Sequence, residues 1–168
     1  MADARLKSFA LAAGVLGLDR VTKSLVERYV SFSADYKIIP GLFDIVHSEN
    51  RGVAFGVLND SASQWTTWLL IALSVAAVIW VSVMLWRAKR LDRLLCWAFA
   101  LVLGGAAGNL FDRVVSGRVT DFLLFYIGGH QWPSFNVADS AIVIGCGLLI
   151  LDQLLEQRQG KHGNANVS

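Results

Sequence analysis

The chain is poor in charge and lacks the patterns that mark most soluble enzymes. Only 17% of its 168 residues are Asp, Glu, Lys or Arg, whereas 55% are hydrophobic, and the mean hydropathy is +0.51. This composition excludes an ordinary soluble domain and indicates a membrane protein. The net charge is only +2, and no basic cluster of groove size occurs, which argues against a nucleic-acid partner.

Cysteine and histidine are also scarce, with two and three residues. Cys96 and Cys146 lie in apolar runs without metal-ligand spacing, so we interpret them as small buried hydrophobic side chains. The histidines are scattered, which argues against a histidine-based metal site. The sequence contains no HExxH, GxSxG, phosphate-binding-loop or GxGxxG motif. We therefore expect no metal and no cofactor.

Four apolar stretches are long enough to cross a bilayer as helices: about 6–26, 65–86, 94–110 and 137–155. The first contains Asp19 and Lys23, which share a helix face and can pair. Its basic start and short apolar run, 9–18, are also typical of a secretory signal peptide. Short β-prone runs between Tyr36 and Leu58 predict a small sheet outside the membrane. Residues 111–136 are predicted to form a polar and aromatic loop.

The basic residues predict the orientation of the chain. The N-terminus, the loop at 87–93 and the C-terminal tail carry eight Lys or Arg in total, whereas the two longer loops carry five. The positive-inside rule then places both termini in the cytoplasm and both long loops outside. In this topology Asp121 lies in the second outer loop, and Asp139 lies in the first turn of the fourth span. Two acids eighteen residues apart are thus expected at one membrane face.

Paired carboxylates in a poorly solvated site share a proton, because both cannot ionise easily. One can accept a proton from water while the other donates to a carbonyl oxygen, which is general acid–base hydrolysis. A purely structural interpretation stays open. Asn136 and Asp139 fit a capping box at the start of the fourth helix, and Asp121 could likewise begin a short helix.

The segment before these acids is rich in small residues. Gly104 and Gly108 form a small-xxx-small pattern, which is typical of close helix packing. Asn109, Asp112 and Arg113 follow at spacings that share one helix face. They are either interfacial anchors or residues that orient the acids, and an arginine there could pair with one carboxylate.

Five blocks of the chain resemble, in order, the lipoprotein signal peptidases (signal peptidase II) of bacteria. They are LDRVTK at 18–23, ENRGVAFG at 49–56, GGAAGNLFDR at 104–113, VTDF at 119–122 and FNVADSA at 135–141. With the four spans, the resemblance covers nearly the whole chain. Val53 and Thr120 stand where the family commonly has alanine and valine, which bears on substrate preference alone.

The resemblance implies an all-α membrane protein of one domain, residues 1–168, with four transmembrane helices. It adds a small extracytoplasmic β-sheet at about 29–62 and a short extracytoplasmic helix within 114–136. The implied activity is that of an aspartic endopeptidase of the bacterial inner membrane. It removes the signal peptide from diacylglyceryl-modified prolipoproteins by cutting before the lipidated cysteine. The implied partners are this substrate and membrane lipids, and we expect a monomer.

The resemblance also assigns residues. The implied catalytic pair is Asp121 and Asp139. The residues implied to support the pair or the substrate are Asn50, Gly108, Asn109, Arg113 and Asn136. Those implied to be structural are Asp19, Lys23 and Asp112. Two rival functions are an ion-coupled transporter with the acids as a proton relay, and an anchoring protein with the acids as helix caps.

Overall fold

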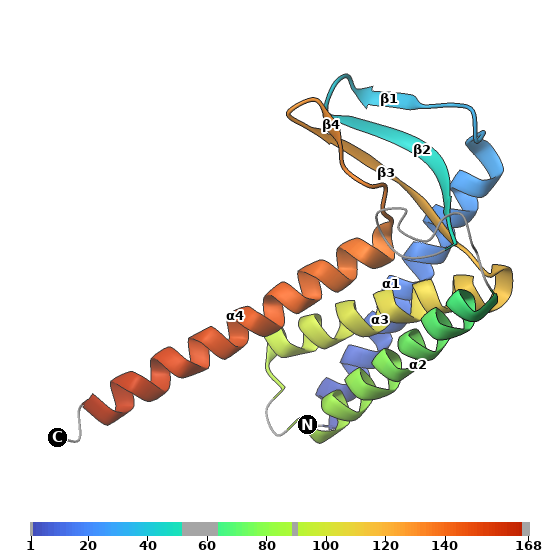
Figure 1. Ribbon diagram of the computed structural model, residues 1–168. Coiled ribbons are helices and arrows are strands. Elements are labelled where there is room, and N and C mark those ends of the chain that lie inside the picture. Colours follow the sequence, from blue (N-terminus) through green and yellow to red (C-terminus); the bar gives the residue numbers. More distant parts are fainter. Residues whose placement is uncertain (1, 52–63, 89–90, 166–168) are drawn as a thin grey trace.

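The computed structural model describes residues 2–51, 64–88 and 91–165, and the side chains up to residue 158. Its elements follow in the order α1–β1–β2–α2–α3–β3–β4–α4. The helices are α1 (Ala2–Tyr29), α2 (Gln64–Arg87), α3 (Arg93–Ser116) and α4 (Val137–Ala165). The strands are β1 (Tyr36–Ile39), β2 (Phe43–Asn50), β3 (Val119–Ile127) and β4 (His130–Gln131). Figure 1 shows the strands at one end of the helices and the start of α1 and the end of α4 at the other.

Three helical segments of the described chain are long and apolar enough to cross a membrane. They are Trp65–Arg87, Arg93–Ser116 and Val137–Arg158, and they coincide with three of the four predicted spans. The predicted span 6–26 lies within α1, which has 28 residues but is not one of the three. Helix α2 exposes large apolar side chains, among them Trp65 and Trp80, as a surface that faces lipid does.

Helix α3 is the centre of the helical bundle, because it packs against α1, α2 and α4. The Asp92 side chain caps its start by accepting a hydrogen bond from the Leu95 N–H at 3.0 Å. Its end is set by Gly117, whose φ of 69° is in the left-handed region and whose N–H donates to the Arg113 carbonyl. The helix therefore runs six residues beyond the predicted span and carries Asn109 and Asp112 within its last turns.

The four strands form one antiparallel sheet in the order β1-β2-β3-β4. Strands β1 and β2 lie where the sequence predicts a sheet, and the last of the β-prone runs, at 53–58, lies outside the described residues. The expected short helix within 114–136 is wrong. That segment forms β3 and β4, because an apolar run rich in β-branched and aromatic residues pairs with β2. For the same reason Asp121 does not begin a helix but lies inside β3.

The two cysteines are less buried than the sequence predicts. Cys96 is half-buried and Cys146 is exposed. Helix α4 packs on α3 with one face only and leaves apolar side chains such as Val143 and Ile150 exposed. Cys146 lies on that open side of the helix, and an apolar environment there would come from lipid rather than from protein.

Candidate active site

Strand β3 brings Asp121 to the start of α4. The Phe135 carbonyl accepts hydrogen bonds from the N–H groups of Phe122 at 3.0 Å and Leu123 at 2.8 Å, and the Phe135 N–H donates to the Leu123 carbonyl. The segment before α4 is therefore held against β3, one residue from Asp121. As a result Asn136 lies directly beside the Asp121 carboxylate, which accepts a hydrogen bond from Asn136 Nδ2 at 2.7 Å.

A β-bulge in β2 places Asn50 on the same side of the sheet as Asp121. Ile45 pairs with Leu123, but the next pair is Ser48 with Asp121, so β2 contains one extra residue. Asn50 is two residues beyond Ser48 and shares its face. Its Nδ2 donates to Asp121 Oδ2 at 3.2 Å. Without the bulge, Glu49 would take this place and a third acid would face the site.

The predicted capping box at the start of α4 is confirmed. The Asp139 N–H donates to Asn136 Oδ1 at 2.9 Å, and the Asn136 N–H donates to Asp139 Oδ2 at 3.2 Å. Capping does not remove Asp139 from the site, however. Its other oxygen, Oδ1, accepts a hydrogen bond from Asn109 Nδ2 at 2.7 Å. The structural and functional interpretations of Asp139 are therefore compatible.

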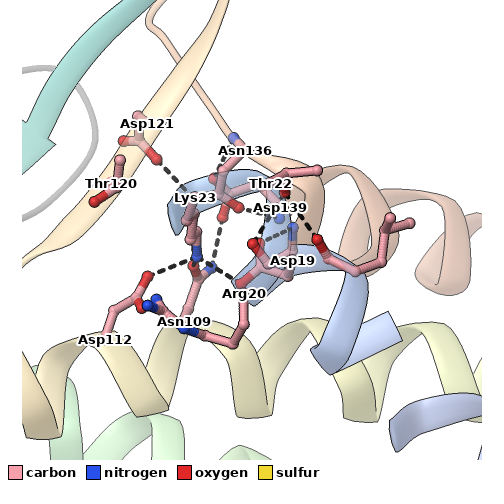
Figure 2. Close-up of polar contacts among 12 residues, drawn as sticks. Asp19, Arg20, Thr22, Lys23, Asn109, Asp112, Thr120, Asp121, Asn136 and Asp139 are labelled. Atoms are coloured by element: carbon pink, nitrogen blue, oxygen red, sulfur yellow. Dashed lines mark hydrogen bonds and ion pairs between the residues drawn. The ribbon is translucent and has the colours of Figure 1, made fainter. Parts of the chain in front are cut away.

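Two amide side chains connect the acids. Asn136 Nδ2 donates to Asp121 and also to Asn109 Oδ1 at 3.3 Å, while Asn109 donates to Asp139. Figure 2 shows these residues converging from β3, α3 and the start of α4. Asn136 is fully buried and Asn109 is 6% exposed. Each acid thus faces an amide whose position is fixed by a second hydrogen bond.

Beneath the amides lies a buried cluster of charges. The Lys23 ammonium is 2.7 Å from Asp19 Oδ2 and 2.7 Å from Asp112 Oδ2, and Arg20 also pairs with Asp112. Two acids and two bases therefore balance. The predicted pairing of Asp19 with Lys23 is confirmed. Breaking such a buried set is strongly destabilising, because one charge would be left without compensation.

Glycines allow this cluster to form. A Cβ on Gly108 would lie 2.6 Å from Asp19 Oδ2, and a Cβ on Gly104 would lie 2.6 Å from the Ala12 carbonyl oxygen. The small-xxx-small pattern therefore does pack α3 closely against α1. In the space that Gly108 leaves, Asp19 Oδ1 accepts a hydrogen bond from the Ala138 N–H in the first turn of α4, at 2.9 Å. Asp19 thus joins α1 to α4.

The electrostatic environment of Asp121 gives its carboxyl group a pKa unlike that of an exposed aspartic acid. Burial, followed by the negative charge of Asp139, raises the pKa of Asp121 to about 6. Hydrogen bonds from Asn50 and Asn136 and the positive charge of Lys23 act in the opposite direction without cancelling the increase. At mildly acidic pH, Asp121 therefore holds a proton that an exposed aspartic acid would have lost.

Arg113 approaches the acids without pairing with them. Its guanidinium donates to the Asn109 main-chain carbonyl at 3.3 Å, and the charges of Asp139 and Asp121 both act on it. Among the described residues, no ion pair joins it to either acid. The expected arginine–carboxylate pair in this part of the chain is formed by Arg20 with Asp112 instead.

Two contacts of the site were not predicted. Arg20 stands one residue after Asp19, and a second basic residue in an apolar span is the signal that could have identified it. Glu27 accepts a hydrogen bond from the Thr120 hydroxyl at 2.8 Å, which ties the end of α1 to β3 beside Asp121. No local pattern relates Glu27 to Thr120, because the contact joins elements 93 residues apart.

Comparisons with known proteins agree on one family. The family profile described as "Signal peptidase (SPase) II" matches residues 11–155. A lipoprotein signal peptidase of Solibacter usitatus is 56% identical over 168 residues, which is all of both chains. One of Nitratidesulfovibrio vulgaris is 45% identical over 154 residues, or 92% of each chain.

Solved structures support the same relationship. Two chains described as a bacterial membrane enzyme superpose with TM-scores of 0.79 and 0.77, at 28% and 29% identity. The first match covers 89% of this chain and 88% of the other, and the second covers 88% and 92%. Profile, identity and fold therefore place this chain in the signal peptidase II family.

Proposed function

We propose that Asp121 and Asp139 are the catalytic carboxylates of this signal peptidase. The observation that carries the proposal is that Asn136 binds both of them. Its side-chain amide donates to Asp121 at 2.7 Å, and its main-chain N–H donates to Asp139 at 3.2 Å. Two acids held by one residue, each nearly or partly removed from solvent, have the arrangement that proton sharing needs.

The two acids take different parts in the reaction. Asp121 carries the shared proton, since its pKa is raised to about 6 by burial and by the charge of Asp139. Asp139 accepts a proton from water, and the water oxygen attacks the scissile carbonyl while Asp121 protonates the carbonyl oxygen. Asp139 then returns its proton to the amide nitrogen as the C–N bond breaks. As this tetrahedral diol intermediate collapses to the carboxyl product, Asp121 takes back a proton from one of its hydroxyl groups, so the initial protonation state returns and no covalent intermediate with the enzyme forms.

The substrate is a prolipoprotein that carries diacylglycerol on a cysteine, and the cut falls before that cysteine. The matched relatives are lipoprotein signal peptidases, which supports this substrate class. The position of the acids supports it too. They lie where the sheet meets the ends of apolar helices, so a peptide at the membrane interface can reach them while its acyl chains stay in lipid.

We further propose that α1 is a fourth span, so that both termini are cytoplasmic and the site is near the outer face of the inner membrane. A helix of 28 residues is about 42 Å long at 1.5 Å per residue. Asp19 and Lys23 are fully buried against α3, so the charges of α1 do not all face lipid. We also propose that the enzyme acts as a monomer among membrane lipids, because Asn109 and Asn136 already connect the two acids by hydrogen bonds within the chain.

The decisive experiment compares Asp121→Asn and Asp139→Asn with Asp44→Asn. Asp44 is a buried aspartate of the same sheet that accepts a hydrogen bond from the Tyr126 hydroxyl, so it controls for the loss of a buried acid. Purified variants are assayed for cleavage of a diacylglyceryl prolipoprotein, and their melting temperatures are recorded. Either site variant should lose turnover by about 10³-fold or more while staying folded, and the double variant should lose little more. Normal turnover by folded Asp139→Asn would show that Asp139 serves only as a helix cap, and it would refute the mechanism.

A further inference from the structure

The Lys23 ammonium sits in an enclosed position with three oxygen neighbours. Its side chain is fully buried. Besides the carboxylates of Asp19 and Asp112 at 2.7 Å, it contacts Asn109 Oδ1 at 3.1 Å. An ammonium group has three donors and no acceptor, so these three contacts use it completely. The two acids explain its charge balance, but they do not explain the contact with an amide.

That third contact determines which way the Asn109 amide faces. Because lysine can only donate, the atom of Asn109 next to it must be the carbonyl oxygen. The amide nitrogen then necessarily points to the opposite side, where it donates to Asp139 Oδ1 at 2.7 Å. Asn136 Nδ2 also donates a hydrogen bond to Asn109 Oδ1, at 3.3 Å, which agrees with this orientation. Rotating the amide by half a turn would direct an oxygen at the Asp139 carboxylate.

The other amide of the site is oriented differently. The Asp139 N–H, at the start of α4, donates to Asn136 Oδ1 at 2.9 Å, so the helix backbone directs Asn136 Nδ2 towards Asp121. Asn109 lies within α3, where the backbone groups bond within the helix, and within the described residues its side chain contacts only other side chains. Lys23 therefore orients the amide of Asn109, as the first turn of α4 orients the amide of Asn136.

We propose that Lys23 is a positioning residue of the peptidase reaction, acting through the Asn109 amide to hold the Asp139 carboxylate in its reactive orientation. The inference rests on the proposed catalytic role of Asp139 and adds to it a chain of two hydrogen bonds from α1. The charged groups around this chain are Asp121 from β3, Arg113 from α3 and the two acids that share Lys23. The Lys23 side chain is fully buried, so its effect should appear in kcat rather than in KM.

Testing this role needs a variant that keeps the buried charges balanced. Lys23→Met alone would leave Asp19 without a counterion and is expected to misfold. The double variant Lys23→Met/Asp19→Asn removes one charge of each sign and leaves Arg20 to pair with Asp112. The asparagine side chain at position 19 can still accept the hydrogen bond from the Ala138 N–H. Asp19→Asn alone is the matched control, because Lys23 keeps both Asp112 and Asn109 as partners and the surplus positive charge falls on Arg20, whose side chain is 27% exposed.

The folded double variant should show a kcat lowered by about 10- to 100-fold, as expected for losing an oriented hydrogen bond to a charged group, with KM little changed. The pH profile gives a readout that packing alone would not move. The charge of Lys23 lowers the pKa of Asp121 against the larger effects of burial and Asp139. In the pH profile of kcat, the decline near pH 6, where Asp121 loses its proton, should therefore move to higher pH in the double variant. It should stay in place in Asp19→Asn.

A second variant decides the matter if the double variant does not fold. Asn109→Leu keeps the approximate shape of the side chain and adds no charge, so the buried acids and bases stay balanced and the bundle should fold. It has no amide hydrogen for Asp139, and kcat should again fall by about 10-fold or more. Unchanged kcat and pH profile in either folded variant would overturn the role of Lys23. If Asp139→Asn were inactive in the same assay, the unchanged kcat would refute only the positioning chain, and the catalytic pair would stand.

Discussion

Replacing Asp121 with asparagine should make the protein more stable while abolishing its activity. Burial and the charge of Asp139 raise the pKa of Asp121 from 3.8 to about 6, a difference of about 2 pKa units. At 1.36 kcal/mol per unit, ionised Asp121 lowers the free energy of unfolding by about 3 kcal/mol. Below about pH 4 the acid is protonated in both folded and unfolded chains, and the cost vanishes. It develops between about pH 4 and pH 6 and is complete above that range.

Asp121→Asn has no charge to bury, so this destabilisation is absent in the variant, and a smaller one from a lost hydrogen bond replaces it. Both oxygens of Asp121 accept hydrogen bonds, from Asn50 and from Asn136. The new amide group faces a donor on one side, which costs about 1 kcal/mol. The net gain above pH 6 is then about 2 kcal/mol, or about 4–8 °C in melting temperature for a chain of this size.

The assay is thermal unfolding in detergent at pH 4 and pH 8, with Asp44→Asn as the control. Asp121→Asn should melt above the unchanged protein at pH 8 and slightly below it at pH 4. The control removes a buried acid of the same sheet that contacts the Tyr126 hydroxyl and lies outside the acid pair, and it should show no such reversal. Equal pH dependence in the unchanged protein and Asp121→Asn would refute the raised pKa and the proton assignment built on it.

Two further outcomes are expected. Gly108→Ala should lower the melting temperature and the folded yield, since its Cβ would lie 2.6 Å from Asp19 Oδ2, whereas Gly147→Ala, with nothing within 4 Å, should be nearly neutral. Equal losses in the two variants would contradict the close approach of α3 to Asp19. For the topology, a reporter fused at Gly129 should report the outside and one fused between α2 and α3 the inside, and the opposite pattern would reverse the proposed orientation.

Local sequence patterns predicted the helical part of the site well. The capping box of Asn136 and Asp139 and the pair of Asp19 with Lys23 both depend on residues three or four apart, and the structure has both. Such contacts follow from helix geometry alone, so a single sequence contains them. The close packing at Gly104 and Gly108 was predictable for the same reason.

The sheet was harder to predict. Strand β3 reads VTDFLLFYI and is buried on both faces over its first four residues, so it lacks the alternation that marks a half-buried strand. Its aromatic and β-branched residues favour a strand, but the glycines that follow favour a loop, and the loop was the prediction made for this segment. The bulge that brings Asn50 to Asp121 depends on pairing between distant strands, and no pattern within either strand encodes it.

The double attachment of α4 has a mechanical consequence. Its first turn is held by Asp19 from α1 and by the cap from Asn136. The segment just before it is hydrogen-bonded to β3 at Phe135, and Asn136 is bonded to Asp121 itself. The backbones that carry the two carboxylates are therefore tied to each other as well as to α1. A peptide would meet an acid pair that is already assembled, so little of its binding free energy would be needed to bring the acids together.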